Sequence, residues 1–199
     1  ANRLYLFISQ INQMIVRTTD QETLFKEACD IAVNLGKFKM TWIGMINKDT
    51  NEVIPTTVTG EDKSYLEKII KITIEDKPEG RGPTGTALRE GKYVVCNDIE
   101  NDLQMLPWQN EALKRGFLSS MSLPIIKFGA VIGAINFYAG EKNFFDSEEI
   151  ALLEEATGDL GFALENFEKE AWKRSASSFI LFFFSIEKLF LYVLLIVFT

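Results

Sequence analysis

A glycine-rich segment near the middle of the chain is the first candidate for chemistry. Residues 80–85 read GRGPTG and match the pattern G-x-G-x-x-G, with which nucleotide-binding proteins hold a pyrophosphate on backbone N–H groups at a helix start. Pro83 removes one of those N–H donors, and Gly91 ends the following segment too early for a crossover helix. The pattern therefore predicts a sharp turn before a short helix rather than a nucleotide site. N–H groups around Gly85 would still be free to touch a ligand.

Nucleophiles and metal ligands are scarce in this sequence. The chain has no histidine and two cysteines, Cys29 and Cys96, which excludes Ser-His-Asp and Cys-His catalysis, histidine-ligated haem and most zinc sites. We therefore expect no metal site, no cofactor and no catalytic residue. Cys96 follows two valines in an expected strand, and we interpret it as a small buried apolar side chain. Two cysteines are too few for a disulfide framework, which favours a reducing, cytoplasmic location.

Aromatic and small polar side chains are the best candidates for a binding site. Pockets for small molecules are mostly apolar and contain a few convergent polar groups. Residues of this kind gather around the ends of the expected central strands and short helices. The candidates are Trp42, Thr84, Thr86, Asn97, Asp98, Trp108, Ser120 and Ser122. For each of them a purely structural role stays open, such as core packing by Trp42 or loop capping by Asp98.

The elements that would position these residues follow from apolar spacing. Residues 2–17 and 146–170 carry apolar side chains three and four positions apart, which predicts a helix at each end of the domain. Between them, β-rich runs predict strands at 40–46, 53–59, 72–74, 93–96, 119–125 and 130–139, with short helices among them. The expected fold class is α+β, with about six strands in one sheet. The terminal helices carry near-heptad seams that could pair two copies of the chain.

The chain divides into two pieces of unlike composition. Residues 1–170 form the expected domain. The tail at 171–199 contains the apolar run 179–198, in which Ser185, Glu187 and Lys188 are the polar side chains. That run is long enough to cross a bilayer, but the central charged pair brings its insertion energy close to zero. A membrane helix and a non-native end both stay open. A net charge of −7, from 21 Lys and Arg against 28 Asp and Glu, predicts no nucleic-acid partner.

Several strings in this order resemble a GAF domain. They are FKMTWIG at 38–44, GRGPTGTALREG at 80–91, VVCNDI at 94–99, Pro107-Trp108, SLPI at 122–125, and Phe145 with Leu152-Leu153. The likeness is strongest to GAF domains of bacterial sensor histidine kinases and diguanylate cyclases. It implies a six-stranded antiparallel sheet with the terminal helices on one face and short helices over a small pocket on the other. The pattern of cyclic-nucleotide GAF domains is broken here, because Phe137 rather than lysine follows Asn136.

The resemblance implies a non-catalytic sensory module of a bacterial two-component or related signalling protein. Such a module would bind an unknown small molecule, pair as a homodimer through its terminal helices, and pass a signal to a kinase or cyclase output domain elsewhere. It would be cytoplasmic, with membrane attachment through 179–198 as an addition. One alternative is a dimerisation spacer without a ligand. Another is an enzyme like the free methionine-(R)-sulfoxide reductases, whose cysteine nucleophiles lie in the loop that reads GPTGTA here, where this chain has no cysteine.

Overall fold

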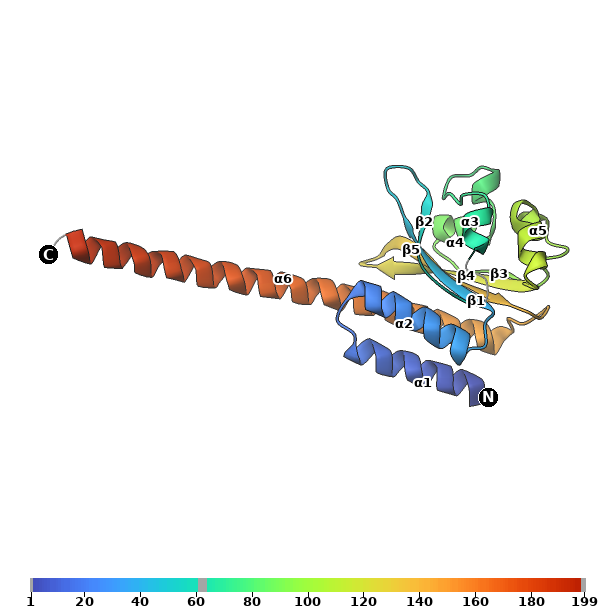
Figure 1. The fold of residues 1–199 in the computed structure, drawn as a ribbon, viewed down its shortest axis with the longest axis horizontal. Helices are drawn as coiled ribbons and strands as arrows, with labels where there is room; N and C mark the ends of the chain where they lie inside the picture. Colours follow the sequence, from blue (N-terminus) through green and yellow to red (C-terminus); the bar gives the residue numbers. More distant parts are fainter. Residues whose placement is uncertain (1, 61–63, 198–199) are drawn as a thin grey trace.

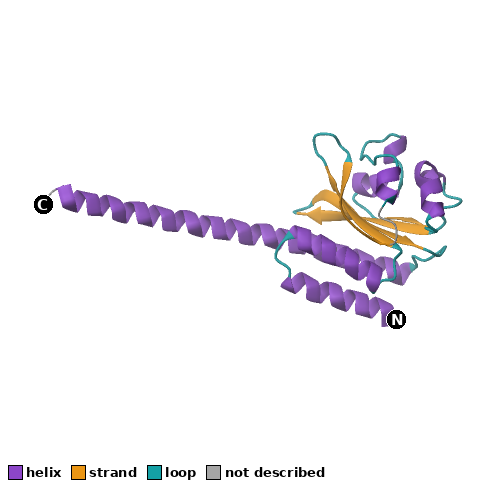
Figure 2. Cartoon of the chain, in the orientation of Figure 1, coloured by secondary structure: helices purple, strands orange, loops and turns teal. Residues whose placement is uncertain are grey.

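A computed structural model describes the backbone of residues 2–60 and 64–197 and the side chains of residues 3–60 and 64–177. Within this part of the chain, one antiparallel sheet lies between two layers of helices (Figure 1). Figure 2 shows the long helices gathered on one side of the sheet and the short ones on the other. The elements are, in chain order, α1 (Asn2–Arg17), α2 (Gln21–Asn34), β1 (Met40–Ile46), β2 (Val53–Gly60), α3 (Tyr65–Lys68), η1 (Pro78–Gly80), α4 (Pro83–Glu90), β3 (Val94–Cys96), η2 (Leu103–Met105), α5 (Leu106–Lys114), β4 (Ser119–Lys127), β5 (Ala130–Ala139) and α6 (Ser147–Val197).

The sheet has five strands among the described residues, in the order β2-β1-β5-β4-β3. The expected sixth strand, at residues 72–74, is not confirmed: it contributes a single bridge, Thr73 to Glu52. Val53 N–H donates to the Ile72 carbonyl at 2.8 Å and Ile74 N–H to the Asn51 carbonyl at 3.0 Å, so the pairing is limited to this one bridge. A three-residue apolar run does not by itself distinguish a strand from a covering loop. Pro55 lies on edge strand β2 beside a register shift, as expected for a residue without an N–H.

The helical layer on the first face is built from α1, α2 and the first part of α6. Phe7, Phe25 and Leu153 belong to its core and are almost fully buried. The seam of α6 packs on the sheet of its own chain, since Leu160 and Leu164 are buried there. The apolar stripes at both ends of the domain therefore form this core, and pairing of two copies through the terminal helices stays a prediction.

Helix α6 continues well past the domain (Figure 1). Within the part of the chain whose side chains are described, no helix has both the length and the apolar character that a membrane span requires. The side chains of residues 179–198 lie outside that part. An apolar C-terminal helix, a membrane attachment and the division at 170 and 171 thus stay predictions.

Two glycines of α6 give a matched test of how closely this helix lies on the sheet. A Cβ at Gly161 would overlap the Ile126 carbonyl, whereas a Cβ at Gly158 would meet nothing within 4 Å. We expect Gly161→Ala to lower the free energy of unfolding by about 1–3 kcal/mol through overpacking. Gly158→Ala should raise it by about 0.5–1 kcal/mol, because alanine is the better helix former. Urea unfolding monitored by circular dichroism measures both, and equal effects of the two variants would contradict the packing.

Candidate functional site

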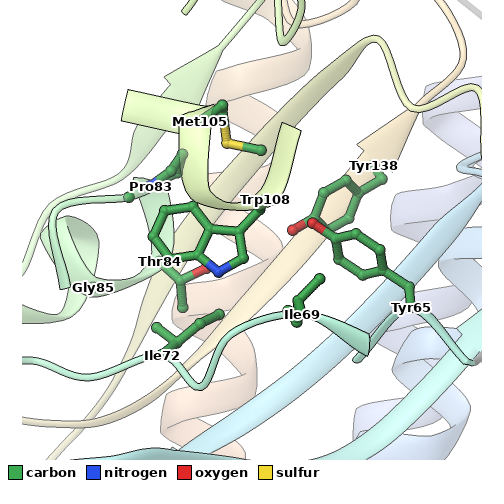
Figure 3. A pocket seen from close by; sticks show the side chains of 10 residues that line it. Tyr65, Ile69, Ile72, Pro83, Thr84, Gly85, Met105, Trp108 and Tyr138 are labelled. Carbon is green, nitrogen blue, oxygen red and sulfur yellow. The ribbon is translucent and has the colours of Figure 1, made fainter. Parts of the chain in front are cut away.

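The second face of the sheet carries a small pocket enclosed by α4, α5 and the segment that follows α3 (Figure 3). The side chains around it are largely aromatic and aliphatic. The lining residues are Tyr65, Ile69, Ile72, Gly82, Pro83, Thr84, Gly85, Met105, Trp108 and Tyr138. Free space at its centre is about 10 Å³, room for roughly one water molecule. The hollow implied by the GAF resemblance is present, but it is nearly closed.

The first turn of α4 forms one wall of the pocket. Its N-cap residue, Gly82, makes no side-chain cap, and Pro83 occupies the first helical turn. The first N–H groups of a helix have no partner within the helix, so the N–H groups of Thr84 and Gly85 are available at the pocket wall. A side chain on Gly82 would overlap the Trp108 ring, which explains why glycine suits this position. Gly91 ends α4 with φ of 65°, as the sequence predicted.

A buried hydrogen-bond network holds this turn against the sheet. Asn136 Oδ1 accepts from Thr84 Oγ1 at 2.8 Å and from Ser122 Oγ at 2.7 Å. Ser122, Asn136 and Trp42 lie opposite one another on β4, β5 and β1, so they form one row across the pocket-facing side. Sequence reasoning missed Asn136 as a site residue. The available signal was a single polar side chain in the otherwise apolar run AVIGAINFYA.

Tyr65 and Tyr138 form the polar end of the aromatic wall. Their hydroxyl groups point toward each other (Figure 3), and their ring centroids lie 5.5 Å apart. Burial raises the pKa of Tyr65, and the neighbouring Tyr138 raises it further. Among the described residues, Tyr65 Oη and Trp42 Nε1 make no hydrogen bond of normal geometry, although both interact with the Tyr138 hydroxyl. Buried polar groups in this state are rare in folded proteins, and here they lie beside the pocket.

The predicted site residues divide into two groups. Thr84 and Trp108 line the pocket, and Trp42, Ser120 and Ser122 lie on the same side of the sheet, in the rows of Asn136 and Tyr138. The other three lie elsewhere. Thr86 Oγ1 donates to the Arg81 carbonyl at 3.3 Å on the exposed side of α4, Asn97 hydrogen-bonds the backbone of Phe145 through both amide atoms, and Asp98 pairs with Lys142 at 2.9 Å.

The two cysteines lie on opposite faces of the sheet. Cys29 belongs to the helical core and Cys96 to the core beneath the pocket, and neither forms a disulfide. Burial, with a smaller contribution from Asp102, raises the pKa of the Cys96 thiol to about 12. Within the described residues no group of three or more cysteine, aspartate or glutamate side chains is placed to hold a metal ion.

A larger surface groove, about 580 Å³, lies on the other face between the end of β4 and α6. Pro124, Glu154 and Gly158 are among its lining residues. Among the described residues, none of those with a buried side-chain polar atom that lacks a hydrogen-bond partner belongs to the lining of this groove. The pocket at α4 is therefore the better candidate site.

A family model described as "GAF domain" matches residues 18–165. This chain belongs to the GAF domain family. Among curated proteins, none matches the sequence.

Similar solved structures include the free methionine-R-sulfoxide reductase of Neisseria meningitidis in complex with its substrate, with a TM-score of 0.70 and 17% identity over 86% of this chain and 95% of that one. The corresponding enzyme of Staphylococcus aureus has a TM-score of 0.65 and 20% identity over 81% and 95%. The GAF domain of an Acinetobacter phosphoenolpyruvate-protein phosphotransferase has a TM-score of 0.65 and 10% identity over 86% and 98%.

These comparisons correct the functional prediction made from the sequence. The expectation of a non-catalytic sensory module without enzymatic activity is contradicted, because GAF folds as similar as these include reductases. The identities of 17–20% establish a shared fold. The finer resemblance to kinase and cyclase sensors stays a prediction.

Two threonines of α4 test the buried network. Thr84→Val removes the hydroxyl that bonds Asn136 while keeping a β-branched side chain, and we expect the free energy of unfolding to fall by about 1–2 kcal/mol. Thr86→Val makes the same chemical change on the exposed side, where about 0.5 kcal/mol or less is expected. Urea unfolding compares them, and a cost for Thr86→Val equal to that for Thr84→Val would reject the network's role.

The thiols give a test that depends on pH. The folded chain keeps the Cys96 proton that the unfolded chain releases near pH 9, since the folded pKa is about 12 and the ordinary value is 9.0. The unfolded state then binds fewer protons, so stability falls as pH rises from about 9 toward 12. Near pH 9 we expect Ellman's reagent to react with neither cysteine in the native protein and with both in urea. Rapid reaction of one native thiol would show an accessible nucleophile and contradict this burial.

Proposed function

We propose that this chain binds a small sulfoxide of the free methionine-R-sulfoxide kind in the pocket at the start of α4. The observation that carries the proposal is that two sets of hydrogen-bond donors belong to the lining of one largely apolar pocket. One set is the uncapped first turn of α4, with the N–H groups of Thr84 and Gly85. The other is the buried Tyr65 hydroxyl, which faces the Tyr138 hydroxyl without a hydrogen bond of normal geometry and could turn to a ligand.

The lining suits the uncharged sulfoxide end of such a ligand, and the ammonium and carboxylate groups of free methionine sulfoxide would stay outside the pocket, in solvent. None of the described residues that line the pocket is aspartate, glutamate, lysine or arginine. A sulfoxide oxygen accepts hydrogen bonds strongly without carrying a net charge. It can therefore accept hydrogen bonds from the N–H groups of α4 and from the Tyr65 hydroxyl. Its removal from water costs less free energy than the burial of an ion.

The remaining walls suit the apolar part of such a molecule. Trp108 and Met105 face the pocket from α5 and η2, and Ile69 and Ile72 close it from the segment after α3 (Figure 3). Sulfur makes favourable contacts with aromatic ring edges. A methyl-sulfur group would thus pack against Trp108 while its oxygen points toward α4 and Tyr65.

Reduction of the bound sulfoxide is a second candidate function. Two similar solved structures are reductases, and Cys96 lies on the pocket side of the sheet, opposite Ser120 on β4. In such a step the Cys96 thiol would take the sulfoxide oxygen to become a sulfenic acid, leaving a thioether. Two equivalents of an external thiol would then restore Cys96 and release water. The raised pKa of Cys96 opposes the step, so binding is the main proposal.

Titration calorimetry with methionine-R-sulfoxide tests the binding proposal. We expect Tyr65→Phe to weaken binding by about 5- to 30-fold, the loss of one buried hydrogen bond of about 1–2 kcal/mol. Tyr93→Phe is the matched control, because Tyr93 lies outside the pocket and is partly exposed, and it should bind like the unaltered protein. Methionine, which lacks the oxygen, should bind more weakly than the sulfoxide.

Absence of binding, or equal affinity in Tyr65→Phe and the unaltered protein, would reject the proposal. Reduction is measured separately, as methionine formed in the presence of dithiothreitol. Activity that disappears in Cys96→Ser would support the second candidate, and its absence in the unaltered protein would remove it.

A further inference from the structure

The pocket at α4 is nearly closed in this structure. Its free space of about 10 Å³ is far below the several hundred Å³ that pockets for small molecules usually offer. A ligand can enter only if one wall moves. The walls formed by β4, β5 and α4 are held together by the Asn136 network, which leaves the segment after α3 and the side chain of Trp108.

The covering segment, residues 69–72, is held mainly at its ends. Ile69 N–H donates to the Tyr65 carbonyl at 3.1 Å, and the Ile72 carbonyl accepts from Val53 N–H at 2.8 Å. Between these ends, the Trp108 indole N–H donates to the Ile70 carbonyl at 3.2 Å. On the outer side an exposed ion pair joins Lys71 to Glu52 at 3.4 Å, and exposed pairs of this kind contribute little.

Trp108 connects the covering segment to α4. Its ring rests on Gly82, where no side chain would fit beneath it, and its N–H reaches across to Ile70. The residue itself is 4% exposed. One side chain thus lines the pocket, contacts the N-cap of α4 and holds the segment opposite.

We infer that residues 69–72 are a lid over the pocket and that the Trp108 indole N–H is the latch that keeps it shut. The role of the lid in ligand entry rests on the proposed function. The local opening of the lid does not depend on that function, because it can be measured on the ligand-free chain. Opening breaks the Trp108–Ile70 bond and lifts Ile72 from β2, which exposes the Val53 amide.

Hydrogen–deuterium exchange of the ligand-free protein tests the latch. Trp108→Phe keeps an aromatic ring and removes the N–H donor. We expect exchange at the Val53 amide and in residues 69–74 to accelerate by about three- to tenfold, the effect of one lost hydrogen bond of modest net strength. Amides of the β1–β5 ladder, which report global unfolding, should accelerate less.

The matched control is the next residue of α5. Gln109 also donates from a side-chain amide to backbone carbonyls, those of Ile99 and Glu100 on another loop. Gln109→Met removes these bonds and should leave exchange at Val53 and residues 69–74 unchanged. Acceleration of the lid in both variants, or in neither, would overturn the latch.

A second variant covers the case in which Trp108→Phe fails to fold. Gly82→Ala keeps the indole but forces its ring away from α4, and the backbone of Gly82 (φ −72°, ψ 173°) accommodates alanine. Faster lid exchange supports the latch, and unchanged exchange rejects it.

Methionine-R-sulfoxide is then added as the probe in stopped-flow fluorescence. With the latch and the proposed function both correct, Trp108→Phe binds the sulfoxide with a larger association rate constant. Faster lid exchange without sulfoxide binding retains the lid and rejects the proposed function. Binding with an unaltered association rate and unaltered exchange rejects the lid and retains the function.

Discussion

Asn136 accepts two buried hydroxyl hydrogen bonds on one amide oxygen, and the geometry of the pocket depends on this shared acceptor. The donors come from separate elements, Thr84 on α4 and Ser122 on β4. Leaving any of these polar groups unpaired inside the core would cost more than the bonds themselves contribute. The network therefore admits one placement of α4 on the sheet. In that placement the uncapped first turn of the helix faces the aromatic wall.

The opposite face provides the rigid support for this arrangement. Helix α1 precedes the region matched by the GAF family model, yet Phe7, Ile11 and Met14 are part of the central core. Arg3 adds a largely buried ion pair with Glu149 at the start of α6 and donates to the Gly36 carbonyl at 2.6 Å. The first helix is thus a structural part of the domain. Pairing of two copies through the terminal helices stays a prediction.

Most of the fold was predictable from the sequence because its periodic signals are long. The predicted strand at 119–125 corresponds to β4, where Ser120 and Ser122 lie on one face, and the predicted end helices at 2–17 and 146–170 supply much of the core on the helical face. The six-strand expectation failed at residues 72–74, which make one isolated bridge, Thr73 to Glu52, instead of a strand.

The site was less predictable, because proximity in sequence does not determine the direction of a side chain. Asn97 and Asp98 follow a pocket strand but bind Phe145 and Lys142. Tyr65 lies in a four-residue helix with no periodic signal, and its place at the pocket depends on contacts with residues distant in the chain. The inference of a non-catalytic role, drawn from the absence of histidine and of a cysteine in the loop that reads GPTGTA, failed for another reason. One fold supports both enzymes and proteins without catalytic activity.

Backbone NMR of the isotope-labelled protein, titrated with methionine-R-sulfoxide, tests the central claim most directly. If the start of α4 is the binding site, the amide resonances of Thr84 and Gly85 shift first and most, and those of Gly91 and Gly158 in the surface groove stay in place. Shifts confined to the groove, or no shift at saturating sulfoxide, would contradict the account.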